Sequence, residues 1–330
     1  MAGVGFALSG ALPLDGTRAV DLLEDVIDAG YAPVLSTEVC ATSALGLTAA
    51  LAARRPGVPL GTGIVPLAAA TDSSIAMGAA TAASLSGTTY YLGVGTSTEQ
   101  IVGGWHGGTY DASVTGTRER LMNLRAVLDG SRRGSFALPK PPGRQVRILL
   151  GALGPRMVEL GMTDGDGVIV NFTPPDTLPA PAADKTVLAY VWVLVDDESE
   201  GRARRDLTGY CLAAPYARHF TSLGYGEVVA LITELAGQRR LREAPDALPA
   251  EFVSTFYATL DRLPGRCSDY RNAGATPVLL PVTGPEPDSL LAGLSAMHPG
   301  QGPRRDAGRP ARRVRGDRHH RSQGVDPRVT

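Results

Sequence analysis

The amino-acid sequence predicts an α/β fold, a (β/α)8 TIM barrel with an elaborated helical segment between its seventh and eighth strands. Three observations lead to this prediction. Short apolar runs recur along the chain, and each is followed by a turn and then by helical spacing of apolar residues. Most of these runs lack polar alternation, which is typical of buried parallel strands. Eight such regular units fit a closed barrel better than the alternative, an open doubly wound sheet.

The first four units are placed by their apolar runs and by the helical patterns behind them. Their strands are expected at residues 4–8, 32–36, 59–65 and 89–95, and their helices at residues 17–29, 44–53, 73–85 and 117–128. The first helix has apolar residues at helical spacing, namely Ala19, Val20, Leu22, Leu23, Val26 and Ile27. A barrel built from such units carries its functional residues at the carboxyl ends of its strands.

Residues 146–172 supply the fifth and sixth strands and predict an anion-binding turn. The segment contains an apolar run, a tight turn, a short helix and a second apolar run. The turn GALG at 151–154 opens the helix at Pro155, a position where a missing amide hydrogen is harmless. Free amides and the helix dipole make this turn a site for phosphate. Arg156 either adds positive charge there or lies in solvent.

The last two strands are separated by a long helical segment. The seventh strand is expected at 187–195 and the eighth at 276–282, followed by a helix at about 288–296. Residues 198–262 hold three or four helical patterns between them. We interpret this segment as an elaborated crossover or insertion that forms one wall of the pocket, and not as a separate domain.

The end of the chain differs in composition from the rest. From about residue 300 it is rich in arginine and contains almost no apolar residues. Such a segment cannot bury enough surface to offset the entropy lost on ordering. The sequence therefore predicts a barrel domain at 1–299 and a disordered arginine-rich tail at 300–330.

Composition excludes several functional classes. The net charge is −1, so nothing global predicts binding to nucleic acid. The apolar runs are all shorter than the roughly 20 residues that span a bilayer. Cys40, Cys211 and Cys267 are too few and too dispersed for a disulfide framework, and no residue set has the spacing of metal ligands. We therefore expect a cytoplasmic protein that uses no metal and binds neither nucleic acid nor membrane.

Four motifs at predicted strand ends carry a resemblance to a known family. In chain order they read STEVCATSALGLTAALA, LGTGIVPL, YLGVGTSTEQIVGGWHG and LLGALGPRMVEL…DGDGVIVNF. Together they resemble the bacterial luciferase-like family, and most closely its branch that uses the deazaflavin coenzyme F420 and is related to methylene-tetrahydromethanopterin reductase. The resemblance covers about residues 3–298. It implies a barrel whose mouth holds a phosphorylated tricyclic coenzyme.

The resemblance also implies which residues bind the coenzyme. The third strand of this family ends in a bulge with a non-prolyl cis peptide that supports the ring, and the matching pair is Gly63-Ile64. Thr96 matches a position after the fourth strand that hydrogen-bonds the coenzyme. The phosphate-binding backbone matches the predicted turn, formed by Gly151, Ala152, Leu153 and Gly154.

Candidate catalytic residues follow the second and fourth strands. Glu38 matches an acidic position near the reactive ring edge, where it holds or relays a proton; otherwise it caps the next helix or pairs with an arginine. Relatives carry histidine around this point, whereas Val39 and Cys40 follow here, and we expect Cys40 to be a small buried filler. His106 is either catalytic, because imidazole titrates near neutrality, or bonded to the backbone.

Trp105 and Asn171 are the candidate substrate-binding residues. Trp105 lies in the glycine-flanked segment GGWHGG, where it can cover the coenzyme or the substrate as a lid. Asn171 follows the sixth strand and either hydrogen-bonds the substrate or the coenzyme tail, or packs.

Three functions are compatible with these residues. The first is an F420-dependent oxidoreductase that transfers a hydride between the coenzyme and a small organic substrate. The second is an FMN-dependent luciferase-like monooxygenase that uses O2 and a partner flavin reductase. The third is a non-catalytic flavin-binding barrel. The pattern around Glu38 and GWHG favours F420, and the resemblance adds the expectation of a homodimer.

Overall fold

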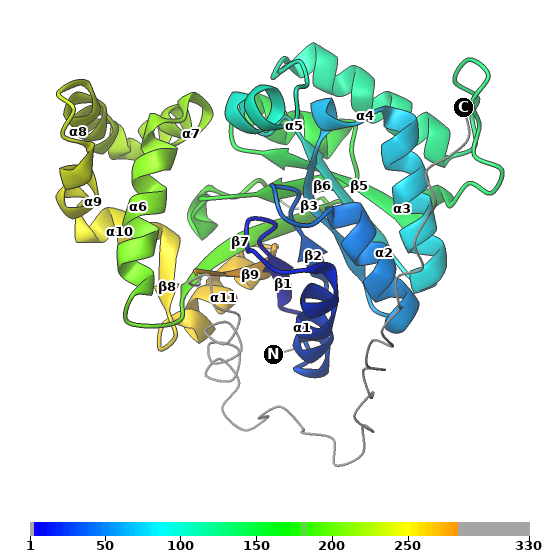
Figure 1. Cartoon of the computed structure of the whole chain (residues 1–330), viewed down its shortest axis with the longest axis horizontal. Helices are drawn as coiled ribbons and strands as arrows, with labels where there is room; N and C mark the ends of the chain where they lie inside the picture. The colour runs from blue at the N-terminus through cyan, green and yellow to red at the C-terminus, as the bar shows by residue number, and fades with distance from the viewer. Residues whose placement is uncertain (1–2, 181, 283–330) are drawn as a thin grey trace, which may run out of the picture.

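Eight parallel strands close into a barrel, as the sequence predicts, and helices surround it (Figure 1). The computed structural model describes residues 3–180 and 182–282. The strands follow one another around the ring in the order β1-β2-β3-β4-β5-β6-β7-β9, and β9 pairs with β1 to close it. Their bounds are Gly5–Leu8 (β1), Val34–Ser36 (β2), Leu60–Pro66 (β3), Tyr90–Gly95 (β4), Val146–Ala152 (β5), Gly167–Val170 (β6), Thr186–Leu194 (β7) and Thr276–Val282 (β9).

Alternate side chains of the strands fill the inside of the barrel. Leu35, Leu149 and Leu188 belong to a buried interior cluster. Val34 and Val187, their neighbours in sequence, belong to the larger cluster that the surrounding helices share. This alternation follows from the two-residue period of a strand. The interior is therefore a packed core, and space for a ligand has to be sought at the strand ends.

Side-chain caps explain where the first four helices begin. Asp15, Ser43, Thr71 and Ser113 each accept a hydrogen bond from the backbone amide three residues further along. These caps satisfy amides that have no partner inside the helix. The helices around the barrel are Gly16–Asp28 (α1), Ala44–Arg54 (α2), Asp72–Ser86 (α3), Val114–Leu128 (α4), Pro155–Thr163 (α5) and Leu263–Asn272 (α11).

The chain between β7 and α11 forms a helical lobe beside the barrel (Figure 1). This lobe has its own hydrophobic cluster, which includes Phe220, Phe252 and Phe256. The sequence predicts three or four helices here, and the structure contains five: Ser199–Leu212 (α6), Ala214–Phe220 (α7), Gly226–Gly237 (α8), Ala244–Ala247 (α9) and Ala250–Phe256 (α10). Single-turn helices also occur, at Leu67–Ala69, Gln100–Trp105, Gly143–Gln145, Pro175–Thr177, Thr221–Tyr225 and Leu241–Glu243.

A ninth strand, Tyr257–Thr259 (β8), is absent from the sequence-based prediction. It pairs in parallel with the last three residues of β7, beyond the part of β7 that pairs with β6. Three residues directly after a helix carry no periodic signal, so the pattern of apolar residues does not reveal it. The helix expected at 288–296 and the tail at 300–330 lie outside the described residues.

Candidate functional site

The end of β3 is irregular at the position that the resemblance singles out. The pairing of β3 with β4 shifts register between Thr62 and Val65, and the peptide bond Gly63-Ile64 is cis. Both the bulge and the cis bond are therefore confirmed. From β7, the Tyr190 hydroxyl donates a hydrogen bond to the Gly63 carbonyl. Glycine is required here, because a Cβ on Gly63 would lie 2.0 Å from the Tyr190 hydroxyl oxygen.

The Ile64 side chain reaches from this bulge to the ends of β4 and β5. A Cβ added to Gly95 at the end of β4 would lie 3.4 Å from Ile64 Cδ1, and one added to Gly151 in β5 would lie 2.9 Å from its Cγ2. The two glycines leave the space that this side chain occupies. Ile64, half-buried, is thus the contact at which the ends of β3, β4 and β5 meet.

The predicted phosphate turn is shorter than expected. Strand β5 continues through Ala152, so Gly151 and Ala152 belong to the strand, and the turn consists of Leu153 and Gly154. Helix α5 then begins at Pro155, and among the described residues no side chain caps it. A Cβ added to Gly154 would meet no described atom within 4 Å. The positive end of α5 therefore lies beside open space and has no side-chain cap, which suits a phosphate.

Arg156 lies in the first turn of α5, directly after the phosphate turn. The side chain is exposed and lines an open hollow of about 470 Å³ on the outer surface, together with Val114, Arg118 and Glu159. That hollow lies between α4 and α5. Of the two alternatives stated for Arg156, the structure supports exposure to solvent.

Glu38 lies next to the bulge and is held by the following helix. Its backbone amide donates to the Ile64 carbonyl at 3.2 Å. Its carboxylate oxygen Oε2 accepts a hydrogen bond of 2.6 Å from the amide of Ala44, the first residue of α2. Glu38 therefore has the alternative role, that of capping a helix. Its carboxylate lies beside the site, and one of the two carboxylate oxygens is hydrogen-bonded to α2.

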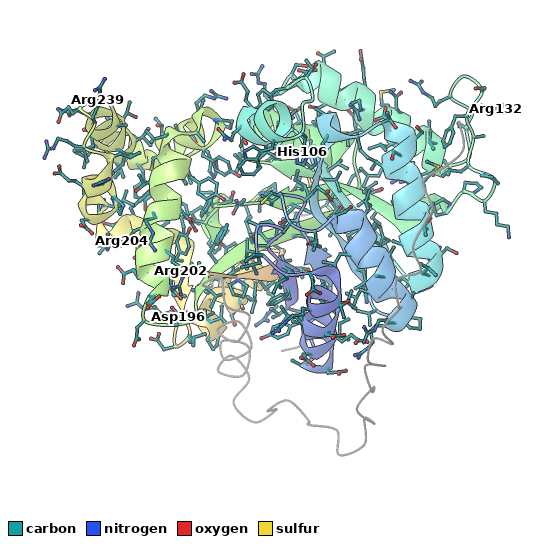
Figure 2. The ribbon with its side chains drawn as sticks, viewed as in Figure 1. His106, Arg132, Asp196, Arg202, Arg204 and Arg239 are labelled. Carbon is teal, nitrogen blue, oxygen red and sulfur yellow. The ribbon has the colours of Figure 1, made fainter. Side chains whose placement is uncertain are left out.

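The loop after β4 brings His106 to the end of β2. His106 Nε2 lies 3.2 Å from the carbonyl oxygen of Val39, so the ring is bonded to the backbone of the segment that carries Glu38. The ring is exposed, and Figure 2 labels it in the upper middle part of the view. Trp105, at the end of the π-helical turn before it, is 51% exposed.

Cys40 is exposed as well. The expectation of a buried filler is wrong, because the segment after β2 bends back to hydrogen-bond Gly10 and leaves the thiol at the surface.

Thr96 directly follows β4. Its side chain is close enough to that of Tyr110, which follows the π-helical turn, to affect the pKa of the Tyr110 hydroxyl. Burial raises the pKa of the Tyr110 hydroxyl, and the nearby Arg218 of α7 opposes this rise. Ser97, the next residue in the chain, has φ of 59°, a left-handed conformation that is uncommon for serine. Thr96 is thus at the strand end as expected, close to a tyrosine.

Asn171 is held between two aromatic residues. Its Oδ1 accepts a hydrogen bond of 2.8 Å from Trp192 Nε1 of β7. Its side chain is also close enough to Tyr216 of α7 to oppose the rise in the Tyr216 pKa that burial causes. Of the two alternatives for Asn171, the structure therefore supports packing. The residue lies where β6, β7 and the helical lobe meet.

An aromatic cluster surrounds Phe172, the residue after Asn171. Phe172 has φ of 49° and is 2% exposed. Its ring stacks on Trp192 at a centroid distance of 5.4 Å and an interplanar angle of 2°. Five further rings contact it at centroid distances of 4.8–6.1 Å, those of Tyr210, Tyr216, Phe220, Phe256 and Tyr257. Local sequence patterns do not reveal this cluster, because its members come from two strand ends and from separate helices.

His219 is the second functional candidate that sequence reasoning missed. This α7 residue is buried, and its Nε2 lies 2.8 Å from the carbonyl oxygen of Phe172. Burial lowers the pKa of His219, and the nearby backbones of Phe172 and Leu153 oppose this shift without cancelling it. The only sequence signal is a histidine in a short helical segment, APYARHF, that also contains two aromatic residues.

Two classes of site are not found in the described part of the chain. Residues 3–180 and 182–282 contain no group of three or more His, Cys, Asp and Glu side chains arranged to hold a metal ion. Within the same residues, each helix is too short or too polar to cross a bilayer.

Comparisons with known proteins agree on one family and one fold. A family model described as luciferase-like monooxygenase matches residues 9–276. Rv3520c of Mycobacterium tuberculosis (strain ATCC 25618 / H37Rv), whose name describes a coenzyme F420-dependent oxidoreductase, is 25% identical, and the match covers 83% of this chain and 93% of that protein.

Solved structures show the same fold. The coenzyme F420-dependent tetrahydromethanopterin reductase of Methanopyrus kandleri aligns with a TM-score of 0.69 and 18% identity, covering 89% of this chain and 96% of that chain. An F420-dependent secondary alcohol dehydrogenase, solved with an F420-acetone adduct, aligns with a TM-score of 0.66 and 13% identity, covering 89% of this chain and 98% of that chain.

Proposed function

This chain belongs to the luciferase-like monooxygenase family, and from that premise we propose that it is an F420-dependent oxidoreductase that transfers a hydride between the coenzyme and a small organic substrate. The names of the relatives support F420 as the coenzyme. The coenzyme, when bound, supplies the hydride chemistry, and the protein supplies binding, orientation and exclusion of water.

The observation that carries the proposal is the uncapped start of α5 beside the bulge of β3. The start of α5 has no side-chain cap among the described residues, and Gly154 faces open space. The backbone amides there would hold the phosphate of the coenzyme. Ile64, in contact with the ends of β4 and β5, would support the ring, and Thr96 would hydrogen-bond it.

His106 and Glu38 are the residues we propose for proton transfer and orientation. With Nε2 of His106 turned toward the Val39 carbonyl, Nδ1 is the atom that exchanges a proton with the substrate. Glu38 is held by the α2 amide and fixes the backbone of the same segment. Trp105, half-exposed in the same loop, would cover the bound substrate.

A substitution at Gly154 tests the anchor without endangering the fold. Gly154 is the N-cap of α5 with φ of −89°, so Gly154→Asp supplies a cap and leaves the free energy of unfolding unchanged or raised by about a few tenths of a kcal/mol. The new carboxylate occupies the amides and repels phosphate, so we expect the Kd for F420 to rise by about tenfold or more, near 1.4 kcal/mol.

Fluorescence titration with F420 and with FMN is the measurement, and Gly154→Ala is the matched control. Alanine meets no described atom and brings neither charge nor cap, so its Kd should rise much less than that of Gly154→Asp. Equal F420 affinity in Gly154→Asp and in the unaltered protein contradicts the anchor. If the protein binds FMN and not F420, the proposed coenzyme is wrong and the coenzyme is that of the flavin monooxygenases.

A further inference from the structure

Trp192 and Ile64 lie on opposite sides of the barrel mouth. In the ring of eight strands, three strands separate β3 from β7 in either direction, so the two strands face each other. Ile64 and Trp192 both pack on the interior cluster, and both are only half-buried. The hydrogen bond from the Tyr190 hydroxyl to the Gly63 carbonyl connects the same two strands. The two half-buried side chains therefore border the space above this hydrogen bond from opposite sides.

The direction of β7 places the Trp192 side chain at the mouth. Leu188 and Tyr190 belong to the interior cluster, and side chains two residues apart lie on the same face of a strand. The pairing of β6 with β7 ends at Val170 and Ala189, so Trp192 lies beyond the end of this neighbouring strand. A half-buried, inward-facing side chain at this level borders the space above the packed core.

Neighbouring side chains fix the orientation of the Trp192 ring. One face stacks on Phe172 at an interplanar angle of 2°, and Nε1 donates a hydrogen bond of 2.8 Å to Asn171 Oδ1. The rings of Tyr257 and Tyr210 contact it at centroid distances of 5.6 and 6.5 Å. Because Nε1 is the single polar atom of an indole, the rest of the ring offers a ligand only flat, apolar surface.

We propose that Trp192 is the specificity-determining wall of the substrate site, and that the carbon of the substrate that exchanges the hydride adjoins a flat, apolar group. This inference rests on the function proposed above, in which the coenzyme ring lies on Ile64. The reacting carbon then approaches the opposite face of that ring to about 3–3.5 Å. The substrate occupies the space between the coenzyme and the indole, where a flat apolar group stacks and a polar group loses hydration without a hydrogen-bond partner on the indole.

The position of Trp192 is directly measurable, because the sequence contains only two tryptophans, Trp105 and Trp192. In Trp105→Phe, Trp192 is the single tryptophan, and acrylamide quenching of its emission lifetime measures how well a small solute reaches it. Trp105 is 51% exposed, so this substitution leaves the fold intact. We expect saturating F420 to lower the quenching constant by about twofold or more, because the bound ring fills the mouth. An unchanged constant overturns the placement of Trp192 at the site.

Two matched ketones test the substrate class. Acetophenone and cyclohexyl methyl ketone share a methyl ketone and a six-membered carbon ring, but only the first ring is flat. In calorimetric titrations of the F420-loaded protein, we expect acetophenone to bind about threefold to tenfold more tightly than cyclohexyl methyl ketone. Equal affinity for the two ketones, or no binding of acetophenone, overturns the proposed substrate class.

Substitutions of Trp192 show whether this residue causes the preference. Trp192→Leu keeps the wall apolar and removes its flat face, so the preference for acetophenone should disappear. Trp192→Phe keeps a flat ring and should retain most of it. Phe256→Leu is the control, because Phe256 contacts Phe172 at 5.6 Å and belongs to the lobe cluster, so its loss weakens the same aromatic group and leaves the wall in place.

The outcomes separate this inference from the proposed function. An unchanged preference in Trp192→Leu, or a preference that Phe256→Leu removes equally, overturns the role of Trp192. If the unaltered protein binds no F420, the proposed function fails. The two ketones titrated into the coenzyme-free protein and into Trp192→Leu then still decide whether Trp192 selects a flat ligand.

Discussion

Tyr190 and Gly63 are joined by a hydrogen bond across the inside of the barrel, from β7 to the bulge of β3. Both residues are buried, and the tyrosine belongs to the interior cluster. The phenol therefore supports, from inside the core, the strand end on which the coenzyme ring is proposed to rest. This contact makes the shape of the bulge testable by substitution.

Tyr190→Phe removes the donor and leaves the Gly63 carbonyl without this partner. An unsatisfied buried acceptor costs about 1–3 kcal/mol, so we expect the free energy of unfolding to fall by that amount. Urea denaturation at neutral pH measures it. An unchanged midpoint and slope would show that the carbonyl finds another partner.

Gly63→Ala introduces a Cβ that would lie 2.0 Å from the Tyr190 hydroxyl oxygen and 3.2 Å from Leu35. Overpacking of this kind costs about 1–3 kcal/mol. Because the shortest contact is with the hydroxyl, the double variant with Tyr190→Phe should lose less stability than the sum of the two single losses. Additive losses in a double-mutant cycle would contradict the contact.

Acid should destabilise the protein through His219. Burial lowers its pKa in the folded state below the ordinary value of 6.5, so the unfolded chain takes up the proton first as the pH falls. The stability from neutral His219 is fully present above about pH 6.5 and is lost below it, by at most about 1.4 kcal/mol per pH unit for one proton.

Denaturation curves of the unaltered protein and of His219→Gln between pH 5 and 8 check this effect. Glutamine does not titrate, so its free energy of unfolding should show a smaller decline below pH 6.5. Identical pH profiles of the two proteins would exclude His219 as the cause.

Asp166 is a structural acceptor at the start of β6, remote from the proposed coenzyme site. It accepts hydrogen bonds from Arg125, from Arg144 at 2.8 Å and from the Ile148 amide at 2.7 Å, and its side chain is 12% exposed. Removing one partner of a buried ion pair costs about 3–5 kcal/mol, so Asp166→Ala should lower the free energy of unfolding by that amount. Its F420 affinity should be unchanged under conditions where it is folded.

Asp164→Ala is the matched control for this prediction. Asp164 pairs with Arg118 at 2.7 Å, but the two side chains are 33% and 49% exposed. Exposed pairs contribute about 0–1 kcal/mol. Equal losses of unfolding free energy in the two alanine variants would contradict the larger stabilising role of Asp166.

Much of the fold could be predicted because its signals are local. Each barrel strand is an apolar run, and each of the first four helices begins at a side chain that caps it, so neighbouring residues determine these elements. The turn before α5 was located correctly, but its length was overestimated. The glycine of Gly151-Ala152 suggested a loop, whereas pairing with β6 extends the strand through both residues.

The site was less predictable because its contacts join residues that are distant in sequence. His219 lies 47 residues after Phe172 and in a segment whose placement depends on tertiary packing. The exposure of Cys40 depends on backbone bonds to Gly10, which no local pattern encodes. The roles of Glu38, His106, Trp105 and Thr96 in binding or catalysis stay predictions.

The direct passage of β5 into α5 has a consequence for how such a barrel can diversify. With two residues in the connection, the proposed anion anchor is part of the barrel wall, whereas the helical lobe has its own hydrophobic cluster. Exchanging that lobe for another would alter which molecules are admitted while the anchor stays in register.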